Sequence, residues 1–165
     1  MMSVLENPVN DAPKLENQFS HEELMEFTRG VLNKIIDSDP LFNELPSDAT
    51  VEEIKAQTAV ARGQAITLNL NRSELSKLAI VVPSNNTTVL ELKKAIQTQT
   101  NLALHREKIK KKISWKHVWK KYHLSSYGVV LNDEKEKIKN YGVSNRTELN
   151  YLKRRREKNR VIKLI

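Results

Sequence analysis

The spacing of apolar and polar positions first predicts a helix between Ser20 and Pro40. Ser20 and Glu23 have the spacing of a capping box. The helix is expected to end at Asp39, because the residue before a proline is driven out of the α region. Its apolar residues recur at helical spacing and form one stripe, consisting of Leu24, Met25, Phe27, Val31, Leu32, Ile35 and Ile36.

A second helix is predicted over residues 50–63. Thr50 and Glu53 form another capping box, several alanines follow, and Gly63 provides a natural end. We expect both helices to brace the rest of the chain. The alternative for the first helix is that Leu24, Phe27 and Val31 enter the groove of a partner protein.

Strand-like alternation begins after Gly63 and predicts a hairpin covered by a helix. Residues 66–71 alternate apolar with polar, 71–74 form a turn, and 78–82 return. Thr88 and Glu91 then make a third capping box. The helix that follows is expected to turn three apolar residues toward the sheet: Val89, Leu92 and Ile96.

The remaining elements are a short helix and three strands. Ser114 is expected to cap the helix, whose apolar positions have the spacing i, i+3, i+4 and i+7: Trp115, Val118, Trp119 and Tyr122. Strands are predicted over 123–126 and 129–131, with Gly128 in the turn. The stretch 137–156 closes the sheet, with a loop at Tyr141-Gly142 and a strand that begins at residue 148.

Three groups of residues resemble known proteins. The run Asn140-Tyr141-Gly142-Val143 with its following strand, and the helix Thr88-Val89-x-x-Leu92-Lys93-x-x-Ile96-Gln97, are similar to ubiquitin-like domains. With Ser114-Trp115, Trp119 and Tyr122-His123-Leu124 between them, residues 39–156 resemble the family of 25-kilodalton proteins of the U11/U12 small nuclear ribonucleoprotein, a particle of the minor spliceosome.

The resemblance implies an α+β fold, a ubiquitin-like β-grasp with an N-terminal helical extension and a helix inserted after the main helix. The expected organisation is a disordered N-terminus (1–19), the extension (20–63), the ubiquitin-like domain (64–156) and a basic tail (157–165).

The family implies a nuclear, non-catalytic structural subunit that acts in pre-mRNA splicing of rare U12-type introns. Its partners would be other U11/U12 proteins. Two alternatives stay open: an adapter of the ubiquitin pathway and a free-standing RNA-binding protein.

Charge is distributed unevenly along the chain. Residues 1–63 hold 5 Lys/Arg and 12 Asp/Glu, whereas residues 64–165 hold 23 and 8, which together give the net charge of +8. Eight Lys/Arg lie in 105–121 and seven in 153–163, with one acid in each stretch. Such clusters neutralise phosphates without regard to sequence.

We therefore hypothesise that these basic residues lie closest to small nuclear RNA. The set is Lys110, Lys111, Lys112, Lys116, Lys120, Lys121, Arg154, Arg155 and Arg156. Trp115 and Trp119 could stack on bases, but their helical spacing favours packing in the core or against a protein partner. A nuclear localisation signal or a solvated tail is the alternative for Arg154, Arg155 and Arg156.

No pattern for catalysis, metal or cofactor binding accompanies these features. There is no cysteine, the four histidines lack a convincing ligand spacing, and four glycines leave little material for a phosphate-binding loop. No apolar run is long enough for a membrane span. We expect a protein without catalytic residues, cofactor, small-molecule substrate or membrane partner.

Overall fold

The computed structural model describes residues 19–155. The chain divides into two units, and the boundary in the sequence falls between Ser47 and Asp48. The two units are described separately. The N-terminal stretch predicted to be disordered lies outside the described residues, except for residue 19. Arg156 and the basic tail over 157–165 also lie outside them.

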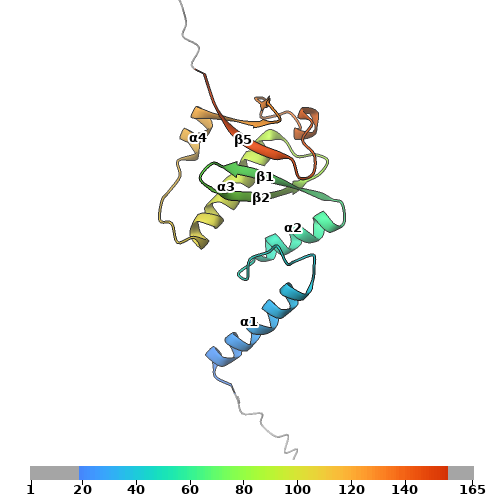
Figure 1. Cartoon of the computed structure of the whole chain (residues 1–165), viewed down its shortest axis with the longest axis vertical. Helices are drawn as coiled ribbons and strands as arrows, with labels where there is room; N and C mark the ends of the chain where they lie inside the picture. Colours follow the sequence, from blue (N-terminus) through green and yellow to red (C-terminus); the bar gives the residue numbers. More distant parts are fainter. Residues whose placement is uncertain (1–18, 156–165) are drawn as a thin grey trace, which may run out of the picture. The chain divides into compact units, whose positions relative to one another are not determined.

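Helix α1 (His21–Ser38) is the main element of the first unit (Figure 1). Its capping box forms as predicted: the Ser20 backbone N–H donates to the Glu23 carboxylate at 2.7 Å, and the Glu23 N–H donates to Ser20 Oγ at 3.2 Å. No residue of α1 is buried, and Phe27 is 69% exposed. The bracing role expected of α1 stays a prediction.

Five strands form one mixed sheet in the second unit, in the order β2-β1-β5-β3-β4 (Figure 1). Their bounds are Ala65–Arg72 for β1, Leu75–Pro83 for β2, Tyr122–Ser126 for β3, Val129–Leu131 for β4 and Glu148–Lys153 for β5. The first and last strands pair in parallel, with Leu70 opposite Leu149, and the other pairs are antiparallel. This is the α+β architecture that the sequence predicts.

Four helices accompany the sheet: α2 (Val51–Ala61), α3 (Val89–Arg106), α4 (Trp115–Lys121) and the 3-10 helix η1 (Ile138–Tyr141). Helix α2 contacts β1 and β2, which supports the bracing role expected of it. The guanidinium of Arg106 on α3 also holds α2, through Glu53 at 2.7 Å and Asp48 at 3.0 Å.

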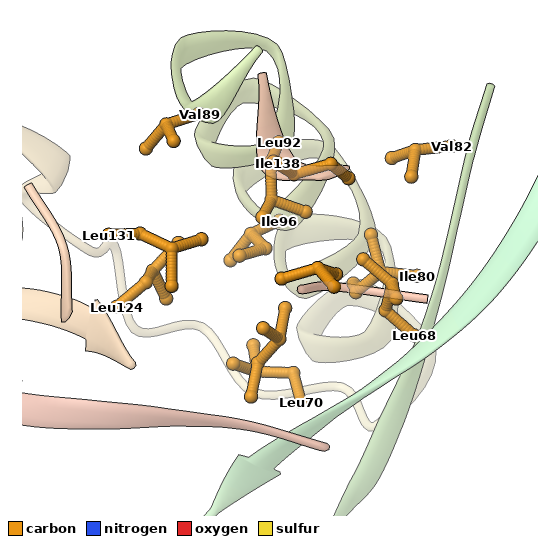
Figure 2. Close-up of a cluster of buried hydrophobic side chains, with 12 residues drawn as sticks. Leu68, Leu70, Ile80, Val82, Val89, Leu92, Ile96, Leu124, Leu131 and Ile138 are labelled. Carbon is orange, nitrogen blue, oxygen red and sulfur yellow. The ribbon is translucent and has the colours of Figure 1, made fainter. Parts of the chain in front are cut away.

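The core lies between α3 and the sheet (Figure 2). Val89, Leu92 and Ile96 are fully buried there, as the helical spacing predicts. They pack in one cluster with side chains from all five strands, from η1 and from the loop after it: Leu68, Leu70, Ile80, Val82, Leu124, Leu131, Ile138, Val143 and Leu149. Each fully buried leucine or isoleucine contributes about 1.5–3 kcal/mol to the free energy of unfolding, so this cluster is the main source of stability.

The loop predicted at Tyr141-Gly142 is present only in part, because Tyr141 is the last residue of η1 and Gly142 follows it. The Tyr141 hydroxyl donates to Asn132 Oδ1 at 3.1 Å and accepts from the Asp133 N–H at 3.2 Å. Gly142 has φ +78°, in the left-handed region that glycine adopts without strain.

Two predictions for the short helix are wrong. Tyr122 begins β3 instead of extending α4, because its backbone pairs with Lys153 and takes extended angles (φ −128°, ψ 147°). Ser114 is the N-cap residue of α4, yet its side chain makes no capping hydrogen bond. The helix therefore begins without the side-chain stabilisation that its sequence suggests.

A candidate nucleic-acid interface

The two basic stretches of the sequence meet where α4 leads into β3. Strand β5 runs antiparallel to β3, so Lys153 lies opposite Tyr122. The register continues past the strand, since the Arg154 N–H donates to the carbonyl of Lys121 at 2.9 Å. The end of β5 thus brings Lys153 and the arginines after it beside Lys120 and Lys121, although the two stretches are far apart in sequence.

These residues line an open hollow of about 1300 Å³. The lining, here called the basic hollow, consists of His117, Lys120, Lys121, Lys153, Arg154 and Arg155. All six residues are exposed. Within residues 19–155, none of the five lysines and arginines has a carboxylate partner. Unpaired cations at one surface are suited to neutralising the phosphates of a polyanion.

His123 lies beside the basic hollow. It lines an adjoining hollow with Leu152, Lys153, Arg154 and Arg155. Burial lowers the pKa of its imidazole, and the charges of Arg154 and Lys93 lower it further. A neutral His123 therefore adds no charge to this surface at pH 7.

The two tryptophans pack on their own chain. Trp115 and Trp119 stack with ring centroids 5.7 Å apart, and the second ring lies 6.1 Å from Tyr151 at the edge of the core. Lys93 Nζ lies 5.3 Å from the centroid of Trp119 and 2.7 Å from the Glu134 carboxylate. These contacts fix α4 against α3 and β5, and so position the lysines of α4.

The predicted RNA-facing residues fall into separate groups. Lys120, Lys121, Arg154 and Arg155 meet at the basic hollow, and Lys116 lies one helical turn before Lys120 on α4. Lys110, Lys111 and Lys112 lie instead in the loop between α3 and α4, at a different hollow. Arg156 lies outside the described residues.

The sequence alone leaves three residues of this region without a role: His117 and Lys153 at the basic hollow, and the buried Lys93 beneath α4. From the sequence, His117 is considered only as a metal ligand, and Lys153 is counted in a basic cluster without being assigned to the RNA-facing set. Lys93 is named only as part of the helix that resembles ubiquitin-like domains, although its side chain is only 4% exposed. Its position next to Leu92, on the buried side of α3, was the available signal.

Neither a metal cluster nor a membrane-spanning helix is found within residues 19–155. No cluster of three or more His, Cys, Asp or Glu side chains there is arranged to hold a metal ion. No helix in that range combines the length and apolar character needed to cross a bilayer.

Comparison with known proteins identifies the fold. A family model described as "Ubiquitin-like domain" matches residues 51–158. The chain belongs to this family. The match confirms the predicted ubiquitin-like fold and includes α2, while the domain boundary expected at residue 64 stays a prediction.

One curated relative has the name suggested by the sequence. It is the U11/U12 small nuclear ribonucleoprotein 25 kDa protein of Arabidopsis thaliana, 25% identical over 131 residues. The similarity covers 79% of this chain and 78% of the relative. The predicted resemblance to these 25-kilodalton proteins is thereby confirmed.

Solved structures include two similar chains, each 19% identical to this one. The solution structure of a ubiquitin-like domain from Arabidopsis thaliana has a TM-score of 0.40, with 55% of this chain and 78% of that chain covered. A chain from a structure described as "Molecular Mimicry of SUMO promotes DNA repair" has a TM-score of 0.34, with 54% and 91% covered.

Proposed function

We propose that this ubiquitin-like protein is a non-catalytic structural subunit of the minor-spliceosome U11/U12 particle. It would act in pre-mRNA splicing of U12-type introns, in the nucleus, through contacts with other proteins of the particle. The observation that carries the proposal is the similarity to the Arabidopsis 25 kDa protein, because it extends over more than three quarters of both chains.

The basic hollow supports the proposal, because a subunit of a ribonucleoprotein particle lies near RNA phosphates. We place Lys116, Lys120, Lys121, Arg154 and Arg155 closest to the RNA backbone. Lysine and arginine contacts to phosphate add affinity without reading bases. The protein neighbours of the subunit would then supply specificity for the particle.

Affinity purification of the tagged full-length chain from nuclear extract tests this function. We expect the minor-spliceosome small nuclear RNAs and their proteins to be enriched over an untagged control. Recovery of ligase or proteasome components without these RNAs would contradict the proposal and favour a ubiquitin-pathway adapter.

A second measurement separates a particle subunit from a free-standing RNA-binding protein. The purified chain alone is titrated with single-stranded RNA at physiological salt. A subunit that depends on its partners binds weakly, whereas tight binding by the isolated chain would contradict the proposed role.

A further inference from the structure

The loop between α3 and α4 borders an open hollow that differs in chemistry from the basic hollow. Its volume is about 370 Å³. Its apolar lining comes from Leu104, Ile109, Ile113 and Trp115, and the consecutive Lys110, Lys111 and Lys112 also line it. We call it the lysine-rimmed hollow.

The backbone builds this hollow through the end of α3. Lys108 adopts the left-handed region at φ +54°, and its N–H donates to the carbonyl of His105 at 3.1 Å. The next N–H, of Ile109, donates to the carbonyl of Leu104 at 2.9 Å. These two bonds make a Schellman motif, in which the residues at the positions of Leu104 and Ile109 commonly contact each other when they are apolar.

The opposite wall is also fixed. The Trp115 indole N–H donates to Asn101 Oδ1 at 3.3 Å, and the ring stacks on Trp119. Ile109, Ile113 and Trp115 are only partly exposed, so the hollow is apolar without being part of the closed core. A wall that is already ordered binds a partner without the entropic cost of ordering it.

The lysines of the rim are exposed and available. Within residues 19–155, none of Lys110, Lys111 and Lys112 forms an ion pair with a carboxylate. Three cations beside an apolar floor complement a peptide that carries carboxylates around one large apolar side chain. RNA fits less well, because phosphates gain nothing from the isoleucines, and one face of Trp115 is already covered by Trp119.

We propose that the lysine-rimmed hollow binds an acidic segment of a neighbouring protein, with one large apolar side chain seated between Ile109, Ile113 and Trp115. The inference rests on the proposed function, since the neighbour would belong to the same particle. It assigns the two basic surfaces to different partners: protein at Lys110, Lys111 and Lys112, and RNA phosphates at the basic hollow.

Cross-linking in particles purified through the full-length chain tests this assignment. A carbodiimide joins a lysine amine to a carboxylate that touches it, and ultraviolet light joins protein to bound RNA. We expect carbodiimide links from Lys110, Lys111 or Lys112 to Asp or Glu of another polypeptide, and RNA adducts on 116–121 and 153–155.

Matched charge reversals sharpen the test. The triple variant K110E/K111E/K112E should reduce co-purification of that neighbour, measured without carbodiimide, on the order of tenfold while the RNA adducts persist. The control K116E/K120E/K121E carries the same change in charge and should do the reverse. Ile113→Asp, with folding checked by circular dichroism, should also lose the neighbour, because it removes part of the apolar floor.

Several results would overturn the proposal: RNA adducts on residues 110–112, links only to carboxylates of the same chain, no link to another polypeptide, or equal loss of the neighbour in the control. Sequencing the bound RNA keeps the two proposals apart. Absence of the minor-spliceosome RNAs would contradict the proposed function, whereas the cross-links alone decide what occupies the hollow.

Discussion

At the scale of single residues, His123 is a histidine whose pKa is lowered first by burial and then by nearby positive charges. Burial, Arg154 and Lys93 together hold the pKa of its imidazole below the ordinary value. In the unfolded chain that pKa returns to about 6.5. As the pH falls, the unfolded chain therefore takes up the proton first. The stability that depends on a neutral His123 is therefore fully present above about pH 6.5 and is lost as the pH falls below that value.

We predict that His123→Gln reduces the loss of stability on acidification. Urea unfolding at about pH 7.5 and about pH 5.5 measures it, since the carboxylates titrate mainly below that window. Wild type should lose more unfolding free energy than the variant between the two values. Equal losses in both proteins would show that His123 does not have a lowered pKa in the folded state.

Lys93 is the buried charge on which the position of α4 depends. Its side chain is 4% exposed and pairs with Glu134, which is 52% exposed. Glu134→Gln leaves that charge without its partner and should lower the free energy of unfolding by about 1–2 kcal/mol. Breaking a fully buried pair usually costs about 3–5 kcal/mol, but here water reaches the glutamate, so we expect a smaller cost. Lys93→Met removes the charge, keeps the apolar stem and should cost less than about 1 kcal/mol. Thermal unfolding of both variants measures this difference, and the opposite order would contradict the role given to Lys93.

At the scale of elements, two similar N-cap residues differ in what they contribute. Thr88 Oγ1 accepts from the Glu91 N–H at 3.3 Å and caps α3, whereas Ser114 makes no such bond at α4. Thr88→Ala should therefore cost about 1 kcal/mol, and Ser114→Ala should change stability by less than about 0.5 kcal/mol. Denaturant titration of the two variants gives the comparison. Equal costs would mean that Ser114 caps its helix in solution.

The elements were predictable where the pattern is local. Three capping boxes mark α1, α2 and α3, and alternation marks β1, so these needed no knowledge of distant residues. Tyr122 was assigned to the wrong element because its helical spacing to Trp119 is a local signal, whereas its pairing with Lys153 joins residues far apart in sequence. The turn at Gly128 also contains Tyr127 in the left-handed region, at φ +46°, a backbone conformation that the sequence does not predict for tyrosine.

The candidate site was predictable in composition but not in arrangement. The clusters on 105–121 and 153–163 are visible as charge runs. Which lysines meet which arginines depends on the antiparallel register of β3 and β5, and no charge pattern encodes that register. The lysine-rimmed hollow depends on the left-handed conformation of Lys108. Helix ends of this kind usually have glycine at that position, so a lysine there gives no signal of the turn.

At the scale of the whole molecule, the basic hollow should make RNA association sensitive to salt. We predict that Lys120→Glu/Arg154→Glu weakens recovery of the particle RNA most at low salt, where screening is least. Each cation removed from a phosphate should make the slope of log affinity against log salt shallower by about 0.7–0.9, so the double variant should change it by about 1.4–1.8. Recovery across a salt series measures this change in slope.

The matched control for that experiment is Lys135→Glu/Lys139→Glu. It makes the same change in net charge at exposed lysines that do not line the basic hollow. The control should retain RNA nearly as well as wild type. An equal reduction in both variants would indicate a response to net charge rather than binding at the hollow.

The most direct test of a role in splicing of rare introns is intron retention after depletion of the protein. RNA sequencing compares U12-type with major-class introns in depleted cells, with and without re-expression of the wild-type chain. A subunit of the minor spliceosome predicts selective retention of U12-type introns that re-expression reverses. Complete depletion with both intron classes spliced normally would contradict it.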